Sequence, residues 1–124
     1  MKISFYALVL TFTATSAMAG GSYISTVMKG SDGPEKYTAI IVSKKAFSAE
    51  ESQGYKVVSK IKFDSGQSYL LRQSVDCSFP SVVDDETGQA VEIHVGKKGG
   101  LAFDQQYAVF YAVCLNKKYK PTLG

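Results

Sequence analysis

The chain of 124 residues has no tryptophan, one histidine and two cysteines. A structural zinc site needs four Cys or His ligands, so these residues are too few to build one. Cys77 and Cys114 are far from the C-x-x-C spacing of thioredoxin-type redox motifs. Many carbohydrate-binding platforms rely on tryptophan, and its absence counts against that class of ligand. We therefore expect no metal and no cofactor.

An excess of charge of one sign is also missing. Lysine and arginine number 14 against 11 aspartates and glutamates, which gives a formal net charge of +3 at pH 7. The longest run of like charge is the acidic stretch at 84–86. A balance this weak gives no argument for nucleic acid or for acidic membranes as partners. We expect no nucleic-acid partner.

Long apolar runs are absent except at the amino terminus, "MKISFYALVLTFTATSAMAG". This segment has a basic Lys2, an apolar run at 3–14 and the small-x-small sequence AMA at 17–19. That order predicts a secretory signal peptide over residues 1–19. The alternative is a transmembrane anchor, but the run is shorter than the roughly 20 apolar residues that span a bilayer. We expect export to the periplasm, cell surface or medium, a mature chain from Gly20 and no integral membrane segment after cleavage.

The residues that follow the signal are enough for one domain with a modest core. Glycine, serine and proline indicate a flexible leader at 20–36, with room for one short strand. The β-branched run "YTAIIVS" at 37–43 predicts a strand. "FSAEESQG" at 47–54 fits a capping box, in which Ser48 and Glu51 exchange hydrogen bonds. It indicates either a single helical turn or a polar loop.

Two hairpins are predicted in the middle of the chain. Apolar and polar residues alternate in "YKVVSKIKF" (55–63) and again in "SYLLRQSVDCS" (68–78), with a Gly-containing turn between them. This pattern predicts an antiparallel hairpin with one buried face. The second hairpin, "SVVDDETGQAVEIHV" (81–95), turns at 85–88 and leads to a flexible connection at 96–100. The buried face of the first hairpin is expected to carry Tyr55, Val57, Ile61, Phe63, Tyr69, Leu71, Val75 and Cys77.

The segment "LAFDQQYAVFYAVCLNKK" (101–118) fits two structures. Its apolar residues recur at helical spacing over 103–115, and Asp104 could cap the start of that helix. The composition of "YAVFYAV" is instead typical of a strand. We favour the helix and expect residues 119–124 to fray. The predicted class is α+β, in a single domain over 37–124: a small antiparallel sheet of about four to five strands, a C-terminal helix packed on it and one disulfide.

Both cysteines lie on the predicted core faces of their elements, where thiols are inert. In an oxidising compartment an even pair in a small domain is most simply a disulfide. Closing the loop between Cys77 and Cys114 would stabilise the fold by about 4 kcal/mol in the chain-entropy model. A reduced buried pair and an intermolecular bridge are the alternatives.

Several other features have both a functional and a structural interpretation. His94 stands at a strand end, where we expect a solvated side chain rather than a pH sensor or catalytic group. The acids at 84–86 predict an ordinary turn, because the D-x-D-x-D-G pattern of a calcium loop is missing. "GKKGG" (96–100) lacks the spacing of a phosphate-binding loop. The lysines of 55–63 predict a solvated strand face, and the aromatic stripe at 103–115 predicts core, with a partner surface as the alternative.

The order of elements over residues 55–116 resembles a known family. "SYLLRQSVDCSFPS" is a strand ending in Asp-Cys, and it is followed by a hairpin and a last segment ending "YAVC". Small exported bacterial proteins of the surface-adhesin protein E family are similar in these features. The resemblance implies a Cys77–Cys114 disulfide and adhesion to host matrix proteins. The chain lacks the tryptophan and the Pro-Gly-Ser type lead into the helix that many members show, and no binding residue can be transferred.

These observations predict an exported, non-catalytic binding protein of the bacterial envelope or surface that engages another protein in an adhesin-like manner. A homodimer through an exposed sheet edge is a further expectation. The alternative is a periplasmic inhibitor or immunity protein of an exported enzyme or toxin, such as a lysozyme, with 96–100 or 84–89 plugging a cleft. We do not expect an enzyme, because His94 has no convergent motif around it.

Overall fold

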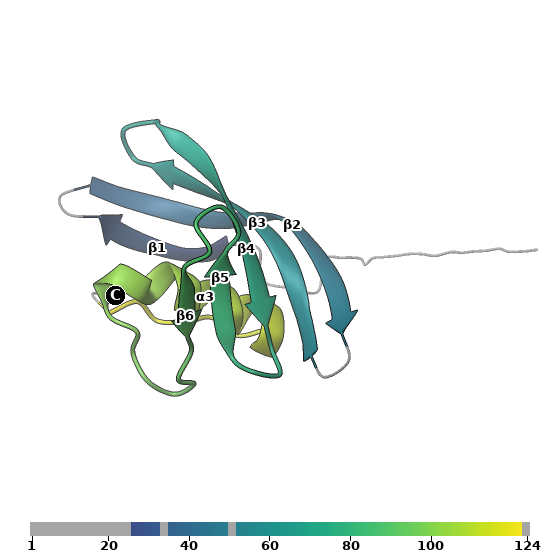
Figure 1. Ribbon diagram of the computed structural model, residues 1–124. Coiled ribbons are helices and arrows are strands. Elements are labelled where there is room, and N and C mark those ends of the chain that lie inside the picture. The colour runs from purple at the N-terminus through teal and green to yellow at the C-terminus, as the bar shows by residue number, and fades with distance from the viewer. Residues whose placement is uncertain (1–25, 33–34, 50–51, 123–124) are drawn as a thin grey trace, which may run out of the picture.

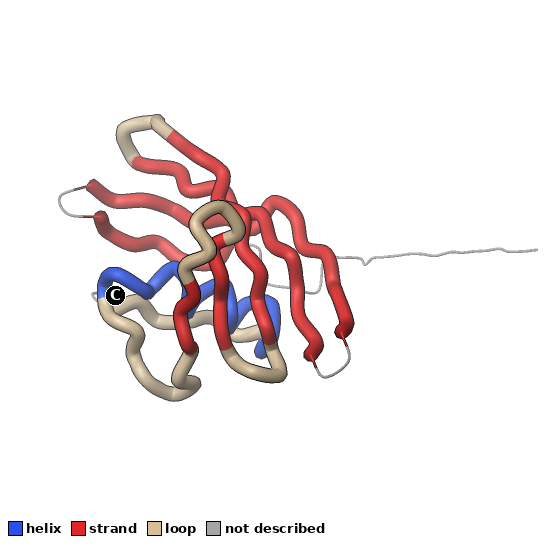
Figure 2. Tube along the Cα trace, viewed as in Figure 1, coloured by secondary structure: helices blue, strands red, loops and turns tan. Residues whose placement is uncertain are grey.

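The computed structural model of the chain describes residues 26–32, 35–49 and 52–122. Within these residues six antiparallel strands pair in sequence order, and the sheet curls around a helical segment on its concave face (Figures 1 and 2). This confirms the predicted α+β class with its C-terminal helix. The strands are β1 (Thr26–Asp32), β2 (Glu35–Ala49), β3 (Ser52–Phe63), β4 (Ser68–Asp76), β5 (Ser81–Asp84) and β6 (Ala90–Glu92).

The sheet has six strands where four to five were expected, and the additional strand is β1, which lies in the predicted leader. Its residues pair with 35–40 of β2. Val27 and Met28 of β1 are only 2% and 6% exposed, so this short apolar patch is part of the core. The predicted signal peptide at 1–19 lies outside the described residues.

β2 and β3 form one long hairpin, and the helical turn or loop predicted at 47–54 is wrong for the described part of that segment. Phe47 pairs with Gly54 and Ser48 pairs with Gln53. Strand pairing satisfies the backbone groups that a capping box would otherwise satisfy, so the local capping preference is overridden. A β-bulge between Ile41 and Ser43 bends β2, as such bulges do, and contributes to the curl of the sheet.

β3 and β4 form the predicted central hairpin, in which Ile61 pairs with Tyr69. Val57 and Ile61 are buried while Lys60 is exposed, so the predicted period of two is confirmed for β3. On β4 the predicted buried face is wrong at Tyr69, which is 51% exposed. The prediction overlooked Gln73, which belongs to the buried face and is 1% exposed. The second hairpin, β5 with β6, is also confirmed and turns within 85–89.

The connection after β6 was predicted to be flexible, but tyrosine hydroxyls of the helical segment and the tail hold it in place. Gly96 and Gly100 have φ angles of 92° and 89°, which few other residues adopt. Three backbone N–H groups of residues 94–99 donate to tyrosine hydroxyls: His94 to Tyr107 at 3.1 Å, Gly96 to Tyr111 at 2.8 Å and Gly99 to Tyr119 at 3.0 Å. We call residues 93–100 the pinned loop.

The C-terminal segment is helical, as its spacing predicted. η3 (Leu101–Phe103) leads into α3 (Asp104–Phe110), which widens into a π-helical turn, η4 (Tyr111–Leu115). Asn116 ends the segment in the left-handed conformation, with φ 51°. The strand alternative is wrong because the aromatic stripe is buried at helical spacing against the concave face. In the described part of the chain no helix has the length and apolarity to cross a membrane.

Asp104 does not cap this helix, contrary to the prediction, because its carboxylate serves the tail. It accepts hydrogen bonds from the Tyr119 hydroxyl at 2.9 Å and from the backbone N–H and hydroxyl of Thr122 at 2.9 and 2.8 Å. The expected fraying is therefore wrong for residues 119–122; 123–124 lie outside the described residues. Burial raises the pKa of the Tyr119 hydroxyl above its ordinary value.

The core lies between the concave face of the sheet and the helical segment. β-branched side chains come from all six strands, including Val91 of β6, and from Ile93 just after β6. The helical side contributes Tyr107, Ala108, Val109, Phe110, Ala112 and Val113. Polar side chains are buried as well, among them Ser59, whose hydroxyl has no hydrogen-bond partner among the described residues.

Candidate functional site

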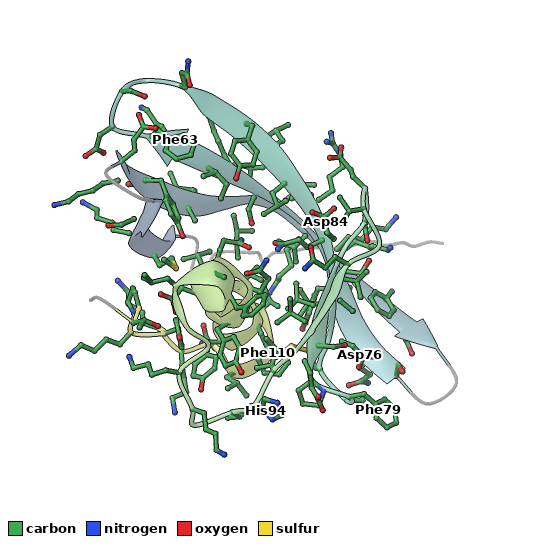
Figure 3. The ribbon with its side chains drawn as sticks, turned by 60° about the vertical axis from the view of Figure 1, so that its left-hand side comes forward. Phe63, Asp76, Phe79, Asp84, His94 and Phe110 are labelled. Atoms are coloured by element: carbon green, nitrogen blue, oxygen red, sulfur yellow. A yellow bond between two sulfur atoms is a disulfide. The ribbon has the colours of Figure 1, made fainter. Side chains whose placement is uncertain are left out.

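A groove remains on the concave face beyond the amino-terminal end of α3. It has a volume of about 330 Å³ and lies between β2, β3 and β4 on one side and residues 101–106 on the other. Phe63 marks the arm of the sheet that extends past the helix (Figure 3). We call this hollow the aromatic groove.

Three rings on neighbouring strands form the sheet wall of the aromatic groove. Tyr37 and Phe63 are register partners on β2 and β3, and their ring centroids lie 6.0 Å apart at 69°. The Phe63 and Tyr69 centroids lie 6.2 Å apart at 34°. Tyr69 is 51% exposed. The rings lie on one face because residues two apart in a strand share a face and the register aligns them across strands.

The helical wall of the aromatic groove is polar. Gln105 and Gln106 line it together with Leu101. The Gln105 side chain is tied to Gln73 on β4 by reciprocal amide hydrogen bonds of 2.7 and 3.2 Å. The Gln106 Oε1 atom is buried and has no hydrogen-bond partner within the part of the chain described. Because this atom is not exposed, a donor in the groove reaches it only if the Gln106 side chain turns toward the groove.

Charged residues surround the next hollow along the same side. Its volume is about 380 Å³, and it shares Tyr37 and Leu101 with the aromatic groove. Its charged lining residues are Lys29, Lys36, Asp64 and Asp104. A ligand that extends from the aromatic groove would therefore meet charge at this end.

The two predicted site residues form the predicted disulfide. The Cys77 and Cys114 sulfur atoms are 1.99 Å apart, and their Cα atoms are 5.6 Å apart. The bond joins the residue after β4 to η4, which holds the carboxyl end of the helical segment against the sheet. Both cysteines also line a hollow of about 400 Å³ beside Phe47 and Tyr55.

His94 lies away from the aromatic groove, beside β6 (Figure 3). Its side chain is 60% exposed, and its Nε2 atom lies 3.9 Å from Oε1 of Glu92. The carboxylate of Asp84 reaches the edge of the groove but accepts hydrogen bonds from the backbone N–H groups of Glu86 and Thr87 at 2.8 and 3.1 Å. No set of three or more His, Cys, Asp or Glu side chains in the described ranges is placed to hold a metal ion.

The lysines of β3 do not act as one strip. All three are exposed, as predicted for a solvated strand face. Lys56 in addition donates to the Ser74 hydroxyl at 2.6 Å and lies 3.6 Å from the Asp85 carboxylate. On the adjacent strand the Lys44 ammonium lies 4.7 Å from the centre of the Tyr55 ring, and burial lowers its pKa.

Sequence reasoning placed Phe63 and Tyr69 on one face but did not identify the groove that they line. The missing partners were Tyr37 and the two glutamines at 105 and 106, which come from elements far apart in the chain. The alternation in β2, β3 and β4 could have indicated three rings on one face. Comparisons of the chain with protein-family models, with curated proteins and with solved structures give no match.

Proposed function

We propose that this protein is an exported, non-catalytic binding protein of the bacterial envelope or surface, and that the aromatic groove takes an extended segment of another protein. The observation that carries the proposal is the combination of a half-exposed aromatic wall with a helical wall that holds an unpaired amide acceptor. The resemblance to surface adhesins, stated from the sequence, supports a protein rather than a small-molecule partner.

The chemistry of the two walls indicates what this segment carries. A volume of about 330 Å³ admits one or two apolar side chains rather than a folded domain. Aromatic or aliphatic side chains would pack on Phe63 and Tyr69, since such pairs contribute about 0.5–1.5 kcal/mol beyond burial. A backbone N–H of the same segment would donate to Gln106 Oε1 once that side chain turns toward the groove. A charged residue of either sign could find a partner beyond Tyr37, where Lys29, Lys36 and Asp64 lie.

The test uses two exposed aromatic residues in different places. Tyr69→Ala opens the aromatic groove, whereas Phe79→Ala removes an aromatic side chain that is 61% exposed at the β4–β5 turn. A photocrosslinking amino acid at each position identifies the partner from the producing cells by mass spectrometry, and its affinity is then measured with purified proteins. We expect Tyr69→Ala to weaken binding about tenfold or more, as a hot-spot residue does, and Phe79→Ala to leave it unchanged. Equal effects of the two substitutions would refute the groove as the binding site.

One observation favours the second candidate, an inhibitor or immunity protein of an exported enzyme or toxin. The turn at 85–89 is exposed and well organised: Asp84 holds the N–H groups of Glu86 and Thr87, and Gly88 N–H donates to the Asp84 carbonyl at 2.7 Å. A rigid acidic turn binds at low entropic cost and suits a cationic cleft. Lysozyme activity measured with the oxidised protein, and with Glu86→Ala as the matched variant, tests this candidate. An unchanged rate of lysis would exclude lysozyme as its target.

A further inference from the structure

Lysines from two segments that are separated in the sequence meet at a small hollow, which Lys97, Lys98 and Lys120 line. Lys97 and Lys98 belong to the pinned loop, and residues 117, 118 and 120 follow the helical segment; all five are exposed. Lys98 joins the two segments, because its ammonium donates to the Lys120 carbonyl and lies 5.4 Å from the centre of the Tyr119 ring. Figure 1 shows the tail running from the carboxyl end of the helical segment back toward its amino-terminal end, near the loop. We call these five lysines the lysine patch: Lys97, Lys98 and Lys120 line the hollow, and the exposed Lys117 and Lys118 stand just before Lys120 in the tail.

The lysine patch is not neutralised by ion pairs of the described residues. Among the described residues two ion pairs are found, Lys56 with Asp85 and His94 with Glu92, and neither includes a lysine of the patch. Asp104, which contacts the tail, is 2% exposed and is engaged with Tyr119 and Thr122. The small net charge of the whole chain therefore conceals a local excess of positive charge.

Apolar side chains accompany these charges. Val95, in the pinned loop, is 53% exposed, and Leu115, two residues before Lys117, is 36% exposed. A small hollow of about 200 Å³ lies between Lys97, Lys98 and Lys120. Exposed lysines beside an exposed apolar side chain are the combination that binds the interface of an anionic membrane.

Other polyanions fit the lysine patch less well. Proteins that bind single-stranded nucleic acid stack bases on exposed aromatic rings. The tyrosines under the patch are unsuited to this, since Tyr107 and Tyr119 are 4% and 6% exposed and their hydroxyls hold the pinned loop. The patch has lysines and no arginine, so it offers point charges rather than the planar forks that grip a single phosphate or carboxylate.

We propose that the lysine patch docks the protein on an anionic phospholipid bilayer, with Val95 entering the interface and the ammonium groups lying among the headgroups. The surface is distinct from the aromatic groove, so a partner segment and a membrane could be held at the same time. Because the loop is already pinned, docking requires little ordering of the chain. Each lysine near such a surface contributes about 1 kcal/mol to the free energy of membrane binding, which corresponds to about a fivefold change in affinity.

The experiment measures binding of the oxidised protein to sedimenting vesicles of equal parts phosphatidylglycerol and phosphatidylcholine. The test variant carries Lys97→Gln, Lys117→Gln and Lys118→Gln. The control variant carries Lys45→Gln, Lys60→Gln and Lys62→Gln, three exposed lysines of β2 and β3. Both variants lose the same net charge, so a difference between them reports the position of the charge.

We expect the test variant to bind about 100-fold more weakly and the control less than about threefold more weakly. Salt at about 0.5 M should abolish binding. Val95→Ser should weaken it without a change of charge. Urea unfolding of each variant shows whether the fold is retained.

Three results would overturn the proposal. Equal loss in the two triple variants would show a response to net charge alone. Equal binding to vesicles of pure phosphatidylcholine would show that the headgroup charge is irrelevant. Displacement by about 10 mM inorganic phosphate, at constant ionic strength, would show a site for a single phosphate in the hollow rather than a membrane surface.

Discussion

The buried amide pair of Gln73 and Gln105 allows a prediction with a definite order of effects. The two side chains exchange hydrogen bonds of 2.7 and 3.2 Å and join β4 to α3 under the aromatic groove. Gln73 is 1% exposed, whereas Gln105 is 8% exposed and lines the groove. We consider Gln→Met at each position and at both, because methionine is similar in length and fills irregular space.

The cost of each substitution depends on the amide that it leaves behind. Gln105→Met leaves the deeply buried Gln73 amide without a hydrogen-bond partner. An unsatisfied buried polar group costs about 1–3 kcal/mol, so we expect the free energy of unfolding to fall by about 3 kcal/mol. Gln73→Met leaves the Gln105 amide at the groove wall, where water replaces the lost partner, and we expect a loss of about 1 kcal/mol. In the double variant no amide is left unpaired, so we also expect a loss of about 1 kcal/mol or less. The coupling between the two sites is then about 3 kcal/mol.

Urea unfolding measures these free energies, provided that the slope of unfolding free energy against urea is the same in all four proteins. The reasoning is refuted if the losses of unfolding free energy in the two single variants add up in the double variant, since that would mean that neither single substitution leaves an unpaired amide. A larger loss for Gln73→Met than for Gln105→Met would refute the assigned role of groove water.

The remaining predictions concern the disulfide, a strand glycine and a tail tyrosine. Replacing Cys77 and Cys114 by alanine should lower the unfolding free energy by about 4 kcal/mol for a loop of this length. Thiol titration of the unchanged protein, denatured but not reduced, should find almost no free thiol. Gly54→Ala should destabilise by about 1–3 kcal/mol in urea unfolding, because its Cβ would overlap the Val75 carbonyl and lie 2.8 Å from the ring of Phe47. The raised pKa of Tyr119 contributes stability that is present below pH 10.0 and is lost as the pH rises through the pKa of the folded protein. Denaturant midpoints measured from neutral to alkaline pH should therefore fall less steeply for Tyr119→Phe than for the unchanged protein.

The sequence was informative wherever a period repeats over several residues. The alternation in 55–63 and 68–78 predicted the central hairpin and its buried face, and the helical spacing over 103–115 predicted α3 and η4. These patterns are readable because burial on one side of an element imposes its own period on the residues. The disulfide followed from the count of cysteines and the core faces on which they lie.

Short local signals failed where distant contacts competed with them. Ser48 has capping chemistry, but pairing with Gln53 keeps it in a strand. Asp104 stands where a helix cap is expected, but the tail brings Tyr119 and Thr122 to its carboxylate. The glycines of the pinned loop indicate freedom, and the hydroxyls of three tyrosines remove it. For Ser48 the pairing of two strands outweighs a local preference, and for Asp104 and the pinned loop hydrogen bonds with residues at least 13 positions away do so.

By itself, then, the sequence determined the class of fold, the main hairpin, the helix and the cysteine pair, because each depends on periodicity or on a count. The tertiary structure alone determined both candidate surfaces. The aromatic groove exists because register aligns rings from three strands beside a helix that covers only part of the sheet. The lysine patch exists because a loop and a tail meet, and no sum of charges along the chain records which charges become neighbours.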